Sequence, residues 1–227
     1  NTRKFPFQTS WGVSTRLIGG IIMTHGDNNG LVLPPAVAPV QIIIVPIAQH
    51  KEGVLEACRA LRDRLKGSFR VKLDESENSA GWKFAQYEMK GVPLRIELGP
   101  RDIEAGQCVM VTRHNGEKHI VSLESIESSA AEMLKNVHDG LYEKALANRE
   151  HRTYACKTPD EINAALAEKG DGFVKTMWCG SPECEAKMKE LCGITSRCIP
   201  FNQEHLADTC VCCGKPAKHM VFWGKQY

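Results

Sequence analysis

Four cysteines near the C-terminal end of the chain have the types and spacing of a metal site. Cys179 and Cys184 form one close pair, and Cys210 and Cys213 form a second, with residues 185–209 between the pairs. Two close thiol pairs separated by a loop of this length are typical of a four-thiolate zinc site. Four thiolates leave no open position for water, so we expect the Zn²⁺ to be structural.

The second pair has three candidate cysteines for its two ligand positions: Cys210, Cys212 and Cys213. Cys210 and Cys213 together give the C-x2-C spacing, which is the better attested one. Gly214 follows Cys213, as suits a metal knuckle whose backbone N–H groups approach the sulfur. Cys210 and Cys213 are therefore the predicted ligands, and Cys212 stays an open alternative.

A second chemical feature lies near the start of the chain, where Ser14 can cap a helix over residues 14–25. Arg16 then falls in the first turn of that helix, although the helix dipole disfavours a cation there. A helix N-terminus together with an arginine is suited to binding a polyphosphate. A solvated surface arginine is the alternative.

Composition limits the classes of protein that the chain can belong to. The 227 residues are 42% hydrophobic and 25% charged, with a formal net charge of +2. These values fit a globular protein and give no overall basic signal for nucleic-acid binding. No apolar run approaches the length of a membrane span. Seven of the ten cysteines lie between residues 179 and 213; thiols kept for metal favour a reducing cytosol, so we expect a cytoplasmic protein.

The hydrophobic pattern predicts an α/β fold with a mixed five-stranded sheet flanked by helices. The apolar run 41–46 suits a strand buried on both faces, and residues 51–66 form an amphipathic helix. Asn115 and Gly116 indicate a hairpin turn between two strands. The pattern also predicts a strand over residues 5–13, a stiff linker over 33–39 and a long helix over 125–150, and the cysteine-rich end predicts a small α+β zinc-binding domain.

Eight sequence motifs, taken in order along the whole chain, resemble the prolyl-tRNA synthetases of the eukaryotic and archaeal type, which are class II aminoacyl-tRNA synthetases. The motifs are FQTSWGVSTRLIG (7–19), THGD (24–27), LPP (33–35), GWKF (81–84), KGVPLR (90–95), LGPRD (98–102), CIPF (198–201) and WGKQY (223–227). The first three resemble motif 3 of the class II catalytic domain.

The resemblance implies three segments. Residues 1–36 would be the C-terminal end of the catalytic domain, residues 37–148 the anticodon-binding domain, and residues 149–227 the C-terminal zinc-binding domain. Motifs 1 and 2 are not found, so we expect the chain to be the C-terminal portion of the synthetase. Some relatives carry a C-x-C spacing in the zinc-binding domain, which is why Cys212 remains open. Tyr227 resembles the terminal tyrosine of the family.

Motif 3 would supply the nucleotide-binding residues. The resemblance implies that Arg16 contacts the γ-phosphate of ATP, as the catalytic arginine, and that its neighbours line the ATP and proline pockets: Ser10, Trp11, Gly12 and Ser14. A fixed guanidinium fits this role, because attack on the α-phosphate expels negatively charged pyrophosphate.

Five residues match the family positions that read the anticodon: Phe84, Glu88, Arg95, Arg101 and Asp102. Prolyl anticodons end in two guanines, and acidic and basic side chains can pair with both edges of that base. Phe84 would stack a base, the two carboxylates would accept from guanine N1–H and N2–H, and the two arginines would donate. The alternatives are a core position for Phe84, an exposed position on a strand for Arg95 and a turn-forming role for Asp102.

The predicted function is therefore that of the C-terminal part of an ATP-dependent, AMP-forming proline–tRNA ligase, inactive by itself. Its partners would be tRNA(Pro) and, in the full-length enzyme, ATP with Mg²⁺ and proline, within a homodimer. The alternatives are a non-catalytic tRNA-binding or scaffold module and the tail of another class II synthetase. The cysteine-rich end argues against the glycyl, threonyl and histidyl types.

Overall fold

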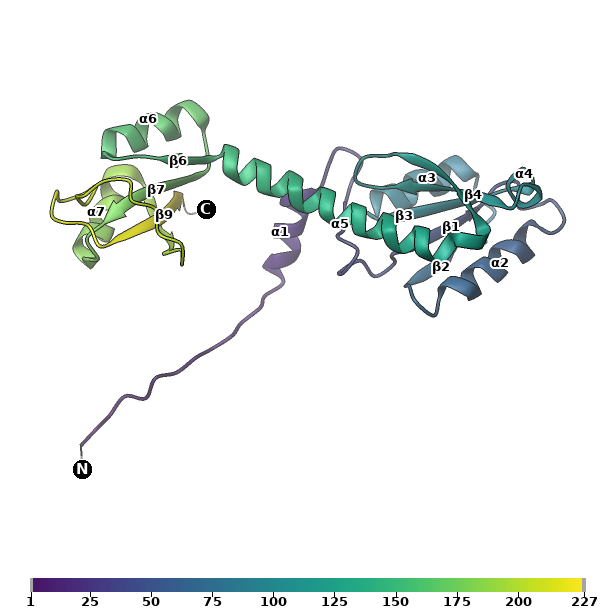
Figure 1. Cartoon of the computed structure of the whole chain (residues 1–227), viewed down its shortest axis with the longest axis horizontal. Coiled ribbons are helices and arrows are strands. Elements are labelled where there is room, and N and C mark those ends of the chain that lie inside the picture. Colours follow the sequence, from purple (N-terminus) through teal and green to yellow (C-terminus); the bar gives the residue numbers. More distant parts are fainter. Residues whose placement is uncertain (1, 226–227) are drawn as a thin grey trace. The chain divides into compact units, whose positions relative to one another are not determined.

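The computed structural model describes residues 2–225, which form two compact units. One unit extends to Glu143 and the other begins at Lys144. Figure 1 gives the order of the helices and strands along the chain. Tyr227 lies outside the described residues, so its resemblance to a terminal tyrosine stays a prediction.

The first unit is built on a mixed five-stranded sheet, which confirms the predicted fold class. Its strands lie in the order β2-β1-β3-β4-β5. The first three are parallel to one another, and β4 and β5 are antiparallel neighbours. The strands are β1 (Ile42–Pro46), β2 (Val71–Leu73), β3 (Leu94–Leu98), β4 (Gln107–Thr112) and β5 (Lys118–Ser122).

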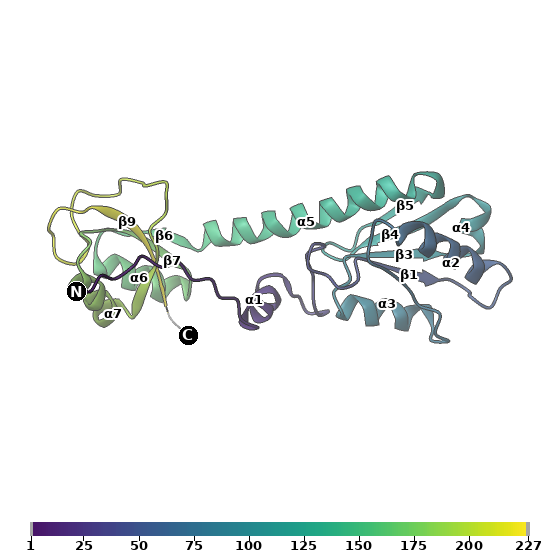
Figure 2. The same cartoon turned by 90° about the horizontal axis from the view of Figure 1, so that it is seen from below.

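Helices cover the two faces of this sheet unequally. On one face α2 (Val54–Leu65) and the first turns of α5 (Ile126–His151) bury Ile42, Ile44 and the alternate residues of β3 and β4. On the other face α3 (Ala80–Met89) packs on Ile43 and Val45. Figure 2 shows α3 and α5 on opposite faces. The face that α3 shares with β3, β4 and β5 is therefore only partly covered, and Ile120 on β5 is 72% exposed.

A buried lysine holds α3 to the neighbouring loops. Lys83 is only 1% exposed, and its Nζ donates to Gln49 Oε1 at 2.8 Å and to the Asp74 carbonyl at 3.0 Å. The Asp74 carboxylate lies 3.8 Å from the same ammonium group. Because a buried charge needs such partners, the lysine of the GWKF motif has a structural role that fixes the orientation of α3.

Residues 2–13 form no strand, so the predicted strand over 5–13 is wrong. Helix α1 (Arg16–His25) follows, with Thr15 rather than Ser14 at its N-cap and no capping bond from the side chain. The side chains of the extended segment are exposed. An alternating apolar pattern gives a strand only where another strand supplies hydrogen bonds, and within the described residues none pairs with this segment.

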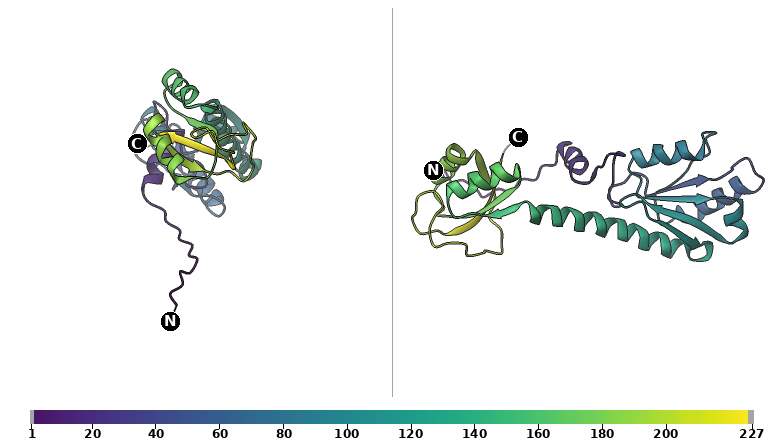
Figure 3. Two further views of the ribbon diagram at one scale, coloured as in Figure 1. Left: turned by 90° about the vertical axis from the view of Figure 1, so that its left-hand side faces the viewer. Right: turned by 90° about the horizontal axis from the view of Figure 1, so that it is seen from above.

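The second unit is a small α+β domain with a four-stranded sheet in the order β6-β7-β9-β8. Its strands are β6 (Thr153–Ala155), β7 (Phe173–Trp178), β8 (Ile194–Cys198) and β9 (His219–Lys225). Helices α6 (Pro159–Lys169) and α7 (Pro182–Cys192) pack on the sheet (Figure 3). The hydrophobic core between them contains the fully buried Trp223. The buried indole N–H of Trp223 donates to Thr176 Oγ1 at 2.8 Å.

Two short helical elements complete the first unit, α4 (Pro100–Glu104) and a 3-10 turn at Leu123–Ser125. None of the helices in residues 2–225 combines the length and the apolar character that crossing a lipid bilayer would require.

Candidate functional site

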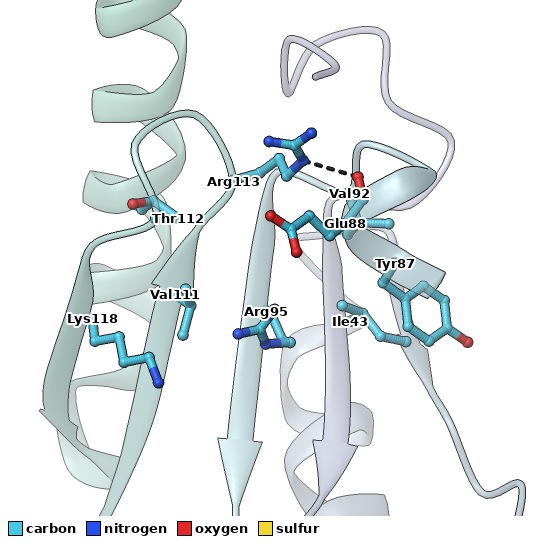
Figure 4. A pocket seen from close by; sticks show the side chains of 10 residues that line it. Ile43, Tyr87, Glu88, Val92, Arg95, Val111, Thr112, Arg113 and Lys118 are labelled. Carbon is cyan, nitrogen blue, oxygen red and sulfur yellow. Dashed lines mark hydrogen bonds between the residues drawn. The ribbon is translucent and has the colours of Figure 1, made fainter. Parts of the chain in front are cut away.

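A cavity of ≈ 150 Å³ opens on the partly covered face of the five-stranded sheet. Its lining combines apolar side chains with one carboxylate and three cations (Figure 4). The lining residues are Ile43, Tyr87, Glu88, Val92, Arg95, Val111, Thr112, Arg113, Gly116 and Lys118. A small hollow with a cationic rim on an open sheet face is suited to an RNA base and its phosphate.

Strand register places the cations of this cavity on one face. Arg95 pairs with Val111 across β3 and β4, and Val111 pairs with Lys118 across β4 and β5. Residues directly opposite in an antiparallel pair share a face of the sheet, so Arg95 and Lys118 flank Val111 on the same side. Lys118 was not among the predicted site residues, although the hairpin at Asn115 and Gly116 implies this register.

Arg95 contacts the ring of Phe84. Its guanidinium carbon lies 4.1 Å from the centre of the Phe84 ring, within cation–π range. Glu97 Oε1 accepts from Arg95 Nε at 3.0 Å and lies 2.9 Å from Arg95 Nη2. Phe84 itself is half-buried against the core. The aromatic ring therefore supports the arginine, and the arginine lines the cavity.

Glu88 enters the same cavity from the C-terminal end of α3 (Figure 4). Its carboxylate Oε1 accepts from Asn29 Nδ2 at 3.0 Å, and its backbone carbonyl accepts from Arg113 Nε at 2.9 Å. Two of the five predicted anticodon-reading residues, Glu88 and Arg95, thus line one hollow, and a third, Phe84, contacts Arg95.

Arg113 is a buried cation that the sequence did not single out. Its side chain is 5% exposed, and its two terminal nitrogens donate to the two carboxylate oxygens of Asp27, each at 2.7 Å. This guanidinium lowers the pKa of Asp27 from its ordinary value of 3.8 to about 2. Such an ion pair between residues far apart in sequence has no local signature that would reveal it.

The other two predicted readers lie elsewhere. Arg101 and Asp102 belong to α4, beyond the C-terminal end of β3, whereas Arg95 lies near the N-terminal end of that strand. Asp102 Oδ2 accepts from the Gly99 backbone N–H at 2.9 Å, so it caps α4. Arg101 is exposed. Neither residue lines the cavity described above.

The five predicted nucleotide-binding residues form no enclosed site among themselves. Ser10, Trp11, Gly12, Ser14 and Arg16 are all exposed, and Trp11 is 93% exposed. Arg16 begins α1, a helix of which no residue is buried.

The second unit brings four cysteine sulfurs together. The Sγ atoms of Cys179, Cys184, Cys210 and Cys213 all lie within 4.8 Å of one another. Cys179 Sγ is 3.6 Å from Cys184 Sγ and 3.8 Å from Cys213 Sγ. Thiolates about 2.3 Å from a tetrahedral ion lie about 3.8 Å apart, so these distances fit a four-thiolate metal site.

Cys212 is not part of this cluster. The turn after Cys210 is a knuckle in which Gly214 N donates to the Cys210 carbonyl at 3.0 Å and Gly214 has φ +69°. The Lys215 backbone N–H lowers the pKa of Cys213 to about 7. Cys212 instead packs against the hydrophobic core of the unit.

Comparison with known proteins now identifies both units. The family described as "Anticodon binding domain" matches residues 41–133, and the family described as "Prolyl-tRNA synthetase, C-terminal" matches residues 159–227. The first match covers the five-stranded sheet with its cavity, and the second covers most of the cysteine-rich unit. Fold and site together thus define a portion of an aminoacyl-tRNA synthetase.

Individual relatives show which type of aminoacyl-tRNA synthetase the chain resembles. The proline--tRNA ligase of Ruminiclostridium cellulolyticum is 55% identical over 100% of this chain and 47% of its own length. The proline--tRNA ligase of Clostridium novyi and proline--tRNA ligase 2 of Bacillus cereus are each 54% identical over 99% of this chain and 47% of theirs. The chain belongs to the prolyl-tRNA synthetase family as its C-terminal portion, and spans about half the length of these relatives.

The pair of Asp27 with Arg113 predicts a defined pH dependence of stability. The pKa of Asp27 is lowered in the folded state, so the ionised carboxylate contributes stability above its ordinary pKa of 3.8 and loses it as pH falls toward about 2. We expect Asp27→Asn to lower the free energy of unfolding at neutral pH. The difference in free energy of unfolding between the variant and the parent chain should shrink as the pH falls from about 4 to about 2. Urea titrations followed by circular dichroism measure this free energy at each pH. A difference that is unchanged down to pH 2 would contradict this assignment.

Proposed function

We propose that this chain supplies anticodon recognition and a C-terminal domain stabilised by a structural zinc ion to a proline–tRNA ligase. One observation supports the proposal: Glu88, Arg95 and Lys118 line the same cavity, and Phe84 contacts Arg95. The cavity lies in the domain that matches the anticodon-binding family. The names of the relatives support tRNA(Pro) as the partner and prolyl-tRNA formation as the activity of the whole enzyme.

A guanine can be read by these groups in a simple way. The Glu88 carboxylate accepts from guanine N1–H and N2–H, because an ionised carboxylate has only acceptors and two oxygens. The base stacks on the guanidinium of Arg95, whose carbon lies 4.1 Å from the centre of the Phe84 ring. Lys118 neutralises a neighbouring phosphate. Arg101 and Asp102 would contact an adjoining nucleotide from α4.

The nucleotide chemistry of the full-length enzyme would use α1. The proline carboxylate attacks the α-phosphorus of ATP, the bond from that phosphorus to the bridging oxygen breaks, and pyrophosphate leaves. Arg16 would bind the γ-phosphate and neutralise charge on the departing pyrophosphate. Ser10, Trp11, Gly12 and Ser14 would line the ATP and proline pockets. ATP, with its Mg²⁺, and proline would bind in the homodimeric full-length enzyme.

The four-cysteine cluster would hold a structural Zn²⁺. Sulfur ligands at these separations favour zinc, and four thiolates leave no coordination position for a substrate. The ion would connect the end of β7 and the start of α7 to the knuckle at residues 210–215. Reduced thiols support a cytoplasmic location. The division into residues 1–36, 37–148 and 149–227 is part of the same proposal.

Anticodon binding is testable by direct titration. We expect an anticodon stem-loop of tRNA(Pro) to bind this chain, and Glu88→Gln to weaken binding by about ten-fold or more, because the amide turns an N–H group toward the guanine donors. Phe84→Ala should cost a comparable factor through the loss of support for the stack. Fluorescence anisotropy with a labelled stem-loop measures both variants.

The matched control is Glu56→Gln on α2, which removes an exposed carboxylate from the opposite side of the sheet. It should bind like the parent chain. Equal affinities for Glu88→Gln and Glu56→Gln would show that the anticodon does not bind in this cavity.

Metal content separates the two possible ligand sets. Single replacement of Cys179, Cys184, Cys210 or Cys213 by serine should abolish stoichiometric zinc, whereas Cys212→Ser should retain one ion per chain. Atomic emission on the purified variants gives the zinc content, and thermal unfolding gives the accompanying loss of stability. Loss of zinc in Cys212→Ser with retention in Cys213→Ser would reverse the assignment.

The chain by itself should not activate proline, because its motif 3 residues are exposed and enclose no pocket. Proline-dependent exchange of labelled pyrophosphate into ATP should therefore remain at the level without enzyme, while the same sample binds the stem-loop. Exchange above that level would refute the prediction.

A further inference from the structure

The turn that follows α1 is attached to the end of α3, the helix that carries Phe84 and Glu88. Leu31 N donates to the Met89 carbonyl at 3.0 Å, and Leu33 N donates to the Gly91 carbonyl at 3.2 Å. Gly30 has φ +129°, and a Cβ atom there would lie 2.6 Å from the Met89 carbonyl oxygen. Only glycine permits so close an approach, so residues 27–33 run directly beside the last turn of α3.

Side chains extend this attachment to Glu88. Asp27 Oδ1 accepts from the Asn29 backbone N–H at 2.9 Å, which closes a local turn. The Asp27 carboxylate is itself fixed by the two hydrogen bonds from buried Arg113, and Arg113 Nε donates to the Glu88 carbonyl at 2.9 Å. Asn29 Nδ2 then donates to Glu88 Oε1 at 3.0 Å. The backbone and the side chain of Glu88 are thus held by one connected network.

This network has a consequence for guanine recognition. A free glutamate side chain samples several rotamers, and ordering it on binding costs free energy. The bond from Asn29 uses one of about four acceptor positions on the ionised carboxylate. Glu88 Oε2 and the second lone pair of Oε1 remain for the two guanine donors. The carboxylate is therefore oriented before RNA arrives, at the cost of a single acceptor position.

We propose that Asn29 is a positioning residue of the anticodon site, which orients the Glu88 carboxylate for guanine; this inference rests on the anticodon-reading role of Glu88 proposed above. Asn29 contacts Glu88 rather than the base. Asp27 and Arg113 position Asn29 in turn. Because the turn continues directly from α1, the segment with Arg16 and the orientation of the anticodon reader are joined by a few hydrogen bonds. Anticodon occupancy consequently stabilises this turn, and displacement of the turn weakens anticodon binding.

A double-mutant cycle tests the proposal on the full chain. Asn29→Ala should weaken binding of the tRNA(Pro) anticodon stem-loop roughly three- to ten-fold, in line with loss of one solvent-exposed hydrogen bond of typical net strength. In a Glu88→Gln background the same substitution should have little further effect, because the carboxylate that it orients is gone. Asn28→Ala is the matched control, since Asn28 is an exposed residue of the same type in the same turn.

Three outcomes overturn the proposal. The first is that Asn29→Ala binds like Asn28→Ala, and the second is that Asn29→Ala weakens binding equally in both backgrounds, which indicates a general structural effect. If Glu88→Gln itself leaves binding unchanged, the proposed anticodon site fails and this inference fails with it. A loss for Glu88→Gln without a loss for Asn29→Ala removes only the inference.

Hydrogen exchange supplies a readout that does not depend on affinity. The amides of Gly30 and Leu31, which donate to the Asp27 and Met89 carbonyls, should exchange more slowly when the stem-loop is bound. Asn29→Ala should abolish this added protection at stem-loop concentrations that saturate the variant. Protection that is equal in the parent and the variant would contradict the link between turn and site.

Discussion

The central strand β1 imposes the main constraint on the first unit. Ile42, Ile43, Ile44 and Val45 are all fully buried, and successive side chains of a strand point to opposite faces. Helices must therefore cover the strand on both sides. On one side α2 and α5 do so over most of the sheet, and on the other α3 covers only β1 and its surroundings. The rest of that second face stays open, and the cavity forms where the edge of α3 meets the exposed part of β3, β4 and β5.

Charges at the rim of the cavity are ordered by contacts within the protein. Arg95 lies between Phe84 and Glu97, and the Arg113 guanidinium donates hydrogen bonds to Asp27 and to the Glu88 carbonyl. A binding site whose groups are already paired loses less conformational entropy when a ligand arrives. In the proposed anticodon site such pairing would also add selectivity, because a base that cannot complete the remaining acceptor positions would leave a desolvated carboxylate unsatisfied.

Local patterns were sufficient to predict the parts of the structure that depend on neighbours in sequence. The apolar run at 41–46, the amphipathic helix after it and the turn at Asn115 and Gly116 each specify an element by themselves, and the cysteine spacing indicated a four-thiolate cluster. The strand expected at residues 5–13 fails because a strand also needs a pairing partner. Arg113 and Asn29 were missed for a related reason: each acquires its contact only after distant segments have packed.

The cysteine-rich unit shows how adjacent residues can serve a metal cluster and a core at once. Cys210 and Cys213 turn toward the sulfurs of Cys179 and Cys184, while Val211 and Cys212 between them pack into the hydrophobic core. Val211 N also donates to the Met177 carbonyl at 3.0 Å, which ties the knuckle to β7. An ion held by the four sulfurs would therefore fix the same four-residue segment that completes the core. Loss of the ion would release both together, so folding of this small unit and metal binding are expected to be one cooperative event.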